Sequence, residues 1–503
     1  MNLVVLGLSA FILYFAAITI HRLILHPLRS FPGPKLAALT TYYQAYFDIV
    51  KGGELLNHIR KLHAEYGPVV RIGPNMLHFA TPQAYHDIYT NGHTFTKYKW
   101  FYYGLGQPES SFSFIDPRKS RTRRALLNPL FSRRAIMKLE SLVQERVDML
   151  IERLKTWPKD EPANLTLAFK CTSIDVISGY CFANCFHALE TPDFRHPILC
   201  AIHELLPNLW IQKHFPILVT VVDLMPEWLA LWVNPRVKPF LEVKNSLATQ
   251  VDKLLASDDA LRSVEHETIF HHLLAPEERD GLNLGRHVRP DRKSLIDEAL
   301  SLIGAGTDTV GLTCTVGIFH ALHNSAITQR LRNELKVAWP DADSPISLSS
   351  LEKLPYLTAV VKESLRLGHG VCTPLPRVVG PSNAVIGGYH VPVGTAVEMS
   401  SVFIHEDPGA FDNPLEFRPE RWLKPDLRNS MEHNFVPFTK GPRICLGLNL
   451  AWCELYLIFA NVFRKVDMKI ADTTVKDMSS YKEYLSPYWE GNTLNVTVRP
   501  INN

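Results

Sequence analysis

Cys445 lies in a short stretch whose composition suits a cysteine thiolate bound to iron in a flat cofactor. Residues 438–447 read F-T-K-G-P-R-I-C-L-G. Gly441 and Gly447 allow the backbone to bend and to approach a planar group closely. Arg443, two residues before the cysteine, would favour an anion nearby and could also reach a carboxylate of the cofactor. The stretch therefore predicts a site for an anionic sulfur ligand.

The residues after Gly447 predict a helix, because apolar side chains recur there at helical spacing. They are Leu448, Ala451, Trp452, Leu455, Ile458, Phe459 and Val462. Cys445 would then lie just before a helix N-terminus, where backbone N–H groups and the helix dipole stabilise negative charge. A lone loop cysteine is usually a small, inert residue, and a zinc site would need more Cys or His close by. Neither alternative explains the combination of Phe, two Gly and Arg.

The spacing F-x-x-G-x-R-x-C-x-G resembles the haem-ligand loop of the cytochrome P450 family. In that family the cysteine that matches Cys445 is the axial thiolate ligand of the haem iron. The resemblance implies haem b (iron protoporphyrin IX) as the cofactor, with Phe438, Gly441 and Arg443 among the residues that hold it. Other segments look like membrane-anchored enzymes of filamentous-fungal secondary metabolism, of the trichodiene-oxygenase type.

A second chemical stretch lies inside an apolar helix expected over residues 294–322, with Ser294 and Asp297 as its N-cap. Residues 304–309, G-A-G-T-D-T, are poor helix formers, and each Gly costs about 1 kcal/mol relative to Ala in a helix interior. Small residues would let the backbone approach a flat partner, while Thr309 could bond back to a carbonyl and open a groove. A glycine kink where two helices cross is the alternative explanation.

The run from Ala305 to Thr309, A-G-T-D-T, resembles the oxygen-activation helix of the same family. The resemblance implies that Ala305 and Gly306 line the cofactor, and that Asp308 and Thr309 are catalytic because they deliver protons for oxygen activation. Val310 departs from the Thr or Ser that is frequent in the family at that position.

A third pattern predicts a structural ion-pair network. Glu363 and Arg366 stand at i and i+3 of an expected helix, and so project from one face. Such a pair alone is usually a solvated ion pair of little worth. The segment F-R-P-E-R-W at 417–422 adds Arg421. Together the three resemble the family's Glu-Arg-Arg lock, which would fix the loop under the haem.

Two further arginines are expected to bind the haem propionates, by resemblance to the family. They are Arg124, whose distance from the Asn128-Pro129 turn matches the family, and Arg377. The family often has Trp four residues before the first of them, where this chain has Ser120. Arg124 belongs to a cationic run over 118–138, for which a solvated helix face and a docking surface for an acidic electron donor are the competing explanations.

Composition describes the scaffold that must position these groups. The chain has 503 residues, 46% hydrophobic and 20% charged, which permits one large enzyme domain. A net charge of +3 gives no reason to expect nucleic acid as a partner. The eight cysteines include no C-x-x-C pair, which favours reduced thiols. Periodicity and resemblance predict a mostly α fold with a small β-rich lobe. The apolar stretch 203–232 is predicted to be core, and by resemblance lies where the family forms its substrate lid.

The N-terminus predicts a membrane anchor. Residues 3–20 carry no charge, and basic residues follow from Arg22 onward. A span of about 18 residues can just cross a bilayer, and the basic flank predicts a cytoplasmic catalytic domain. A cleaved signal peptide is the alternative. The expected division is a transmembrane anchor at 1–21, a basic and Pro-rich linker at 22–40, and a catalytic domain at 41–503. The resemblance implies single-pass anchoring in the endoplasmic reticulum membrane.

The resemblance implies a haem-thiolate monooxygenase. It would use O₂ and NADPH-derived electrons, delivered by NADPH–cytochrome P450 reductase with cytochrome b5 as an additional donor. It would hydroxylate or epoxidise a hydrophobic small molecule, by analogy a terpenoid or related metabolite. Two alternatives stay open. A haem-thiolate isomerase or dehydratase would work without NADPH. A non-catalytic haem-binding protein would not need Asp308 and Thr309.

Overall fold

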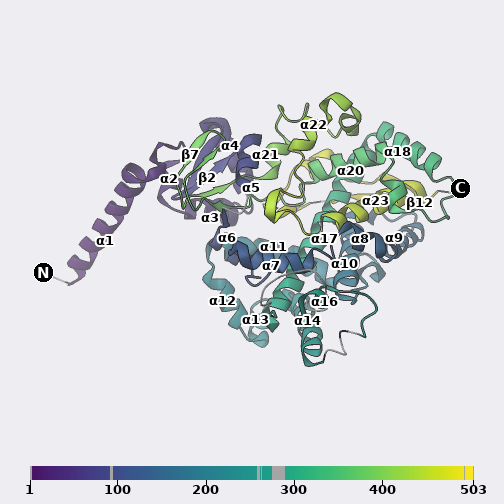
Figure 1. Ribbon diagram of the computed structural model, residues 1–503, viewed down its shortest axis with the longest axis horizontal. Helices are drawn as coiled ribbons and strands as arrows, with labels where there is room; N and C mark the ends of the chain where they lie inside the picture. The colour runs from purple at the N-terminus through teal and green to yellow at the C-terminus, as the bar shows by residue number, and fades with distance from the viewer. Residues whose placement is uncertain are drawn as a thin grey trace.

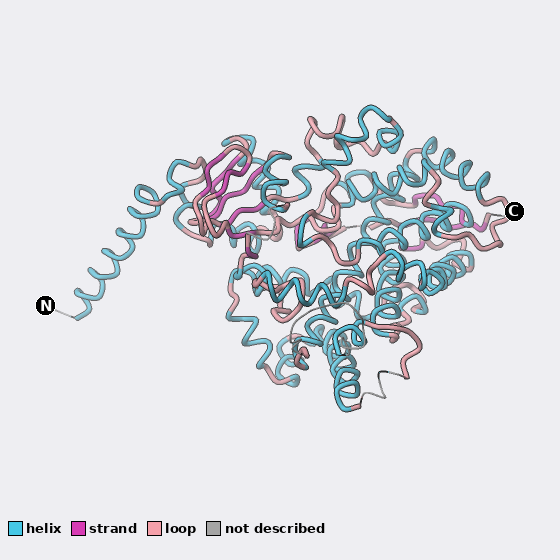
Figure 2. The backbone as a smooth tube through the Cα atoms, in the orientation of Figure 1, coloured by secondary structure: helices cyan, strands magenta, loops and turns pink. Residues whose placement is uncertain are grey.

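The computed structural model describes residues 3–90, 95–257, 261, 263–274, 289–491 and 493–501. Helices form most of the molecule, and a five-stranded sheet gathers in a small lobe beside the N-terminal helix (Figures 1 and 2). The two ends of the chain lie at opposite ends of the molecule (Figure 1). This architecture confirms the predicted mostly α fold with a small β-rich lobe.

The helices and strands follow in chain order. The helices are α1 (Leu3–Ile20), α2 (Lys35–Leu39), α3 (Tyr42–Ala45), α4 (Leu55–Tyr66), α5 (Pro82–Tyr89), α6 (Lys99–Tyr103), α7 (Pro117–Leu127), α8 (Arg133–Lys138), α9 (Glu140–Lys155), α10 (Leu165–Phe182), α11 (Pro197–His214), α12 (Ile217–Leu224), α13 (Glu227–Val233), α14 (Lys238–Ala256), α16 (Ile269–Leu274), α17 (Arg292–His323), α18 (Ser325–Ala338), α19 (Leu348–Leu351), α20 (Pro355–Gly368), α21 (Ser401–His405), α22 (Pro425–Asn434), α23 (Leu448–Lys465) and α24 (Val475–Ser479). The strands are β1 (Val69–Gly73), β2 (Met76–Phe79), β3 (Thr96–Lys97), β4 (Ala163–Asn164), β5 (Arg377–Val378), β6 (Ala384–Ile386), β7 (Tyr389–Val391), β8 (Ala396–Glu398), β9 (Val466–Ile470), β10 (Lys482–Tyr484), β11 (Ser486–Tyr488) and β12 (Asn495–Pro500).

The β lobe is built on a five-stranded sheet with strand order β1-β2-β8-β5-β3. Strands β1 and β2 pair antiparallel, and every residue of both is buried. At the other edge β3 pairs with β5, which sets Lys97 directly opposite Arg377. Like charges directly opposite each other repel. The sheet therefore places two buried cations side by side, in a position that calls for a nearby anion.

Helix α17 is the central helix of the larger part, and it packs mainly against α10 and α20. It covers the helix predicted from the apolar pattern. Its N-cap is Asp291, whose carboxylate accepts the Ser294 amide at 2.8 Å, so the prediction of Ser294 with Asp297 as the N-cap is wrong. The Ser294 hydroxyl instead donates to the Glu109 carbonyl at 2.8 Å.

The N-terminal helix stands clear of the body (Figure 1). Two helices of the described chain are long and apolar enough to cross a membrane. Val4–Leu25 has a mean hydropathy of 2.1 and is not buried, while Arg292–His323 is 72% buried in its most apolar window and is a core helix. The first helix fits a membrane anchor. Residues 1–2 and 502–503 of the predicted division lie outside the described residues.

The segment expected to be a linker, 22–40, packs on the β lobe. Leu28 and Ala37 are fully buried, and the Arg71 amide donates to the Pro32 carbonyl at 2.7 Å. A Cβ on Gly33 would lie 2.5 Å from the Arg71 carbonyl oxygen, so the two segments are in close backbone contact. The helix that leads out of the body is therefore anchored firmly to the β lobe.

The prediction of a core position for residues 203–232 is wrong in its second half. Helix α11 contributes the fully buried Trp210, but α12 and α13 present apolar side chains to the outside. Trp228 and Trp232 are 70% and 78% exposed. Composition alone could not show this, because apolar side chains serve equally well in a core and on a surface that contacts something apolar.

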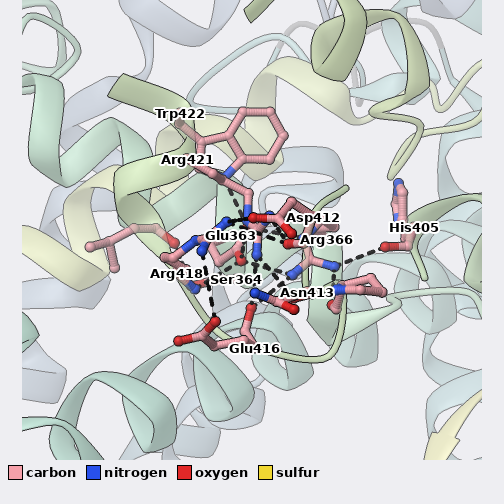
Figure 3. A network of polar contacts seen from close by, with 12 residues as sticks. Glu363, Ser364, Arg366, His405, Asp412, Asn413, Glu416, Arg418, Arg421 and Trp422 are labelled. Carbon is pink, nitrogen blue, oxygen red and sulfur yellow. Dashed lines mark hydrogen bonds and ion pairs between the residues drawn. The ribbon is translucent and has the colours of Figure 1, made fainter. Parts of the chain in front are cut away.

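A buried network around Glu363 joins α20 to the segment before the Cys445 loop (Figure 3). Glu363 accepts from Arg366 at 2.7 and 3.0 Å, from Arg421 at 3.0 Å, from the Trp422 indole at 2.9 Å and from the Arg418 amide at 3.0 Å. Burial would raise the pKa of Glu363, but the hydrogen bond and charge of Arg366, with the charge of Arg421, outweigh it and lower the pKa. The predicted pairing of the three residues is present.

The remaining donors of both arginines go to backbone carbonyls of one segment. Arg366 donates to those of residues His405, Pro414 and Glu416, and Arg421 to those of Asp412, Asn413 and Glu416. A buried ion pair is tolerable when its polar atoms have partners, and every side-chain nitrogen and oxygen of Glu363, Arg366 and Arg421 has at least one. We infer that this network fixes the main chain at 405–422, from which the chain leads to the Cys445 loop.

We expect Gly317→Ala in α17 to lower the free energy of unfolding by about 1–3 kcal/mol. Its Cβ would lie 1.9 Å from Ser364 Oγ and 2.7 Å from Phe459 Cζ, so α20 and α23 must move. The control is Gly179→Ala in α10, whose Cβ would lie 3.6 Å from Leu142. It should be neutral or stabilising by up to about 1 kcal/mol. Urea unfolding curves with equal midpoints for the two variants would contradict the packing described.

We expect Glu363→Gln to destabilise the protein by about 3–5 kcal/mol at neutral pH, because it leaves two buried guanidinium groups without a carboxylate. The folded pKa of Glu363 lies below the ordinary value of 4.5, so its contribution is complete above that value and is lost as the pH falls through the folded pKa. The difference in the free energy of unfolding between Glu363→Gln and the wild type should therefore become smaller in acid. Glu416→Gln, which removes an exposed side-chain carboxylate of the same segment, 3.9 Å from Arg418, serves as the control and should change stability by less than about 1 kcal/mol.

Candidate functional site

Cys445 lies deep in the molecule, yet its side chain is exposed, so it faces an internal space. Its amide donates to the Phe438 carbonyl at 3.0 Å, which closes the loop. Gly441 has φ of +72°, and a Cβ there would lie 2.2 Å from the Tyr89 carbonyl oxygen, so no other residue fits. Among the described residues no cluster of three His, Cys, Asp or Glu side chains could hold a metal ion, which argues against a protein-only zinc site.

The surroundings of the Cys445 sulfur act on its charge in opposite directions. Burial raises the pKa of the thiol, while a hydrogen bond from the Gly447 amide and the charge of Arg124 lower it. Arg124 also donates to the Ile444 carbonyl at 2.7 Å. The cation that influences the sulfur is therefore Arg124, whereas Arg443, expected from its place in the sequence to favour this anion, points away toward residues 111–120.

Four cations approach one another beside this loop, and we call them the cation cluster: Lys97, Arg124, Arg377 and Arg443. Arg377 donates to the Tyr102 hydroxyl at 2.6 Å. Lys97 lies 4.0 Å from the centroid of the same ring and donates to the Phe112 carbonyl. Arg443 donates to the Ser120 hydroxyl and, at 2.9 Å, to the Phe114 carbonyl. The two predicted propionate ligands, Arg124 and Arg377, thus lie in one cluster with Arg443.

In the part of the chain that the structure describes, the cation cluster lacks a carboxylate partner. Within the described residues its hydrogen bonds run to carbonyl and hydroxyl oxygens, and none of the four pairs with a carboxylate. Burial and then repulsion from Arg377 and Arg443 lower the pKa of Lys97 well below its ordinary value. Burial and Arg377 lower the pKa of Arg443 to about 10. Repelling, partly buried cations of this kind fit a site for anionic groups of a ligand.

On α17, the residues Gly304 and Ala305 are exposed within an otherwise largely buried helix, so they too face an open space. The Thr309 hydroxyl donates to the Ala305 carbonyl at 2.9 Å, which is the back-bond predicted from the sequence. Gly306 also has a packing role that the sequence did not show. A Cβ there would lie 2.7 Å from Ile177 Cγ1 of α10, so the close approach of the two helices requires a glycine.

Asp308 forms a buried ion pair with Lys170 of α10 at 2.7 Å. Gly311 makes room for this lysine, because a Cβ there would lie 2.9 Å from Lys170 Cγ. A buried carboxylate needs such a partner. Burial, and then the charge of Lys170, lower the pKa of His203 of α11, which stacks on Tyr488 with ring centroids 4.3 Å apart. The predicted relay residue is thus held by a cation that the sequence analysis did not identify.

Two residues of the site were missed, and only one left a signal in the sequence. Lys170 is one of two charged residues in the apolar run of α10, and a charge that is buried in such a helix must find a partner. Lys97 belongs to no motif and joins the cation cluster through strand pairing across the sheet. Nothing in its sequence neighbourhood distinguishes it.

Comparison with known proteins identifies the family. The family model described as Cytochrome P450 matches residues 34–487. Cytochrome P450 monooxygenase sdnE of Sordaria araneosa is 34% identical over 97% of this chain and 96% of the relative. Tryptophan 6-hydroxylase fscE of Fusarium equiseti is 36% identical over 97% of this chain and 96% of the relative. N-acetyltryptophan 6-hydroxylase ivoC of Emericella nidulans is 33% identical over 95% of this chain and 93% of the relative.

The residues present fit the family's cofactor. Haem b carries an iron that accepts a thiolate ligand and two propionates that need cationic partners. The chain offers a cysteine facing an internal space, a cation cluster without carboxylate partners, and small exposed residues on α17. Together with the match over nearly the whole chain, this shows that the protein belongs to the cytochrome P450 family and is a haem-binding monooxygenase.

Proposed function

We propose that this protein inserts one oxygen atom of O₂ into a hydrophobic small molecule, with electrons that originate from NADPH. Haem bound through a thiolate supplies the iron at which O₂ is reduced. Cys445 would hold that iron, and the cation cluster would hold the propionates. The observation that carries the proposal is the pairing of this cradle with a buried carboxyl group, that of Asp308, next to the exposed small residues of α17.

The residues of α17 would supply protons and keep room for small ligands. Because the Thr309 hydroxyl bonds to the Ala305 carbonyl, its oxygen lies on the helix surface beside the open space. Asp308 would exchange protons with that surface, and Lys170, 2.7 Å away, would hold its carboxyl group in position. A carrier of haem would need the cradle without these groups, which is why we favour an enzyme.

We further propose that the electrons come from NADPH–cytochrome P450 reductase, with cytochrome b5 as an additional donor. The reductase would dock beside the cationic helices α7 and α8, because basic side chains favour an acidic partner. The N-terminal helix would hold the protein in the endoplasmic reticulum membrane, with the catalytic domain on the cytoplasmic side.

The substrate class is proposed from the relatives. By analogy with enzymes of fungal secondary metabolism, the substrate would be a terpenoid or a related metabolite. Two relatives are named as hydroxylases of tryptophan and N-acetyltryptophan, which adds indole compounds to those worth testing. Hydroxylation of an aromatic or aliphatic carbon is therefore the expected reaction.

We expect the full-length protein, in microsomal membranes with reductase, to form a product that contains one atom from isotopically labelled O₂. Terpenoids and indole derivatives would be offered, and products identified by mass spectrometry. Product formation should require NADPH. Cys445→Ser should lose both product and the thiolate-type spectrum of the reduced carbon monoxide complex, because its hydroxyl does not replace the thiolate ligand.

A product that forms at the same rate without NADPH and reductase would favour an isomerase or dehydratase. A haem-loaded protein that turns over no compound, while its cellular role survives in Asp308→Asn, would favour a non-catalytic haem-binding protein.

We expect Asp308→Asn to slow NADPH-dependent product formation by about 10²–10⁴-fold, because an amide cannot take up and release the proton. Haem content and the carbon monoxide spectrum should remain, so the loss would lie in turnover and not in cofactor binding. Asp467→Asn, which breaks a surface ion pair with Arg332, serves as the control and should retain activity. Wild-type turnover in Asp308→Asn, measured as product per NADPH consumed, would remove Asp308 from the mechanism.

A further inference from the structure

The loop at 109–114, which joins α6 to α7, is bound on one side by two carboxylates of α17. The Ser111 amide donates to Glu298 Oε2 at 2.8 Å, and its hydroxyl donates to Glu298 Oε1 at 2.5 Å. The Glu109 amide donates to Asp297 Oδ2 at 3.1 Å. Two neighbouring acidic residues of the central helix therefore hold the beginning of the loop.

On its other side the same loop is bound by the cation cluster. Arg443 donates to the Ser111 carbonyl at 3.4 Å and to the Phe114 carbonyl at 2.9 Å. Lys97 donates to the Phe112 carbonyl. The loop is thus a short bridge of backbone between α17 and the cations that fit the haem propionates.

Glu298 is a buried carboxylate, and burying a charge costs free energy unless it is paired. It is 1% exposed, and its charge is balanced by Arg123, which lies 2.8 Å from Oε2 and also donates to the Ser294 hydroxyl at 2.9 Å. The carboxylate therefore takes three close hydrogen bonds, of which two come from Ser111. A hydrogen bond to an ionised acceptor is shorter and stronger than a neutral one. Most of the hydrogen bonds to this buried carboxylate thus come from one loop residue.

The place of this contact along α17 relates it to the active site. Glu298 precedes Ala305 by about two helical turns, or about 10 Å. The loop accordingly stands beside the part of α17 that leads to its exposed, cofactor-facing residues. Phe112, at its centre, is 36% exposed, and its ring centroid lies 5.7 Å from that of Tyr102 and 4.2 Å from Lys97 Nζ.

We propose that Glu298 is a positioning residue for substrate selection. By fixing Ser111 it fixes the 109–114 loop, and with it the Phe112 ring, as one wall of the space above the haem. It touches neither haem nor substrate and acts through Ser111. This inference rests on the proposed haem site, because the cation cluster supplies the opposite anchor of the loop. Glu298 would in this way set the shape of the pocket in which an apolar substrate is oriented.

The test compares two variants in the full-length, haem-loaded protein. Ser111→Ala removes the hydroxyl contact and leaves the Arg123–Glu298 ion pair intact. Glu298→Gln weakens all three contacts. Ser111→Thr keeps both donors and should behave as wild type. If Glu298→Gln fails to fold, Ser111→Ala carries the test.

The matched control is Asp175→Asn. Asp175 is a fully buried carboxylate of α10 that accepts the amides of Ala188 and Leu189 at 2.7 and 2.9 Å, and so anchors a different loop. Its loss should disturb stability without altering the pocket. This separates a loss of loop position from a general effect of removing a buried charge.

The first measurement is hydrogen exchange of the amides in 109–114. The Ser111 amide donates to the Glu298 carboxylate. In Glu298→Gln the amide hydrogens of this loop should therefore exchange about tenfold faster than in the wild type. The second measurement uses imidazole and 4-phenylimidazole, nitrogen ligands of haem iron whose dissociation constants are read from the shift of the haem absorption band. Imidazole should bind as in wild type, while the dissociation constant of the bulkier 4-phenylimidazole should change about fivefold or more in both variants.

Wild-type exchange and wild-type affinity for both ligands in the two variants would overturn the inference. So would an equal change for both ligands, since that would mean damage to the haem site as a whole. The proposed function fails in a different way, namely if wild-type protein binds no imidazole or lacks a thiolate-type carbon monoxide spectrum. The two failures are therefore distinguishable.

Discussion

The hydrogen bonds that Arg366 and Arg421 make to the Glu363 carboxylate are the contacts on which the site depends most. They lie between a core helix and an irregular segment, and they are buried almost completely. An irregular segment has no ladder of hydrogen bonds to fix its course, so its position must come from side chains. Here one carboxylate orients two guanidinium groups, and these orient the backbone from which the chain passes to Cys445. The sulfur can thus be held in place by a helix that does not touch it.

The same constraint, that buried charge must be balanced, applies at Glu363, Glu298 and Asp308 and at the cation cluster. The ion pairs at Glu363, Glu298 and Asp308 are each completed within the chain. The cation cluster is not, and its members repel one another. A ligand that brings two carboxylates would relieve this repulsion. Anything that binds the folded protein alone stabilises it, so haem loading and folding should be thermodynamically linked.

Sequence reasoning predicted the parts of the site that are set by local spacing. The helix after Gly447, the back-bond of Thr309 and the i, i+3 pair of Glu363 with Arg366 all follow from neighbours along one element. By resemblance it also predicted the tertiary contact of Arg421 with Glu363. It missed tertiary contacts outside the motifs, such as the ion pair of Lys170 with Asp308 and the close packing of α10 on Gly306. The exposure of α12 and α13 was also out of reach, because apolar side chains do not reveal whether protein or another apolar phase covers them.

The Glu363 network has a consequence for how the chain can vary. The six hydrogen bonds that Arg366 and Arg421 make between residues 405 and 416 all go to main-chain carbonyls, five in number. Every residue type presents a carbonyl, so side chains in this stretch can be exchanged without removing an acceptor. Inserting or deleting a single residue would displace several acceptors at once. The side chains of this stretch can therefore vary while its length must stay constant. A chimera that takes the stretch from a relative should keep the number of residues, even where their types differ.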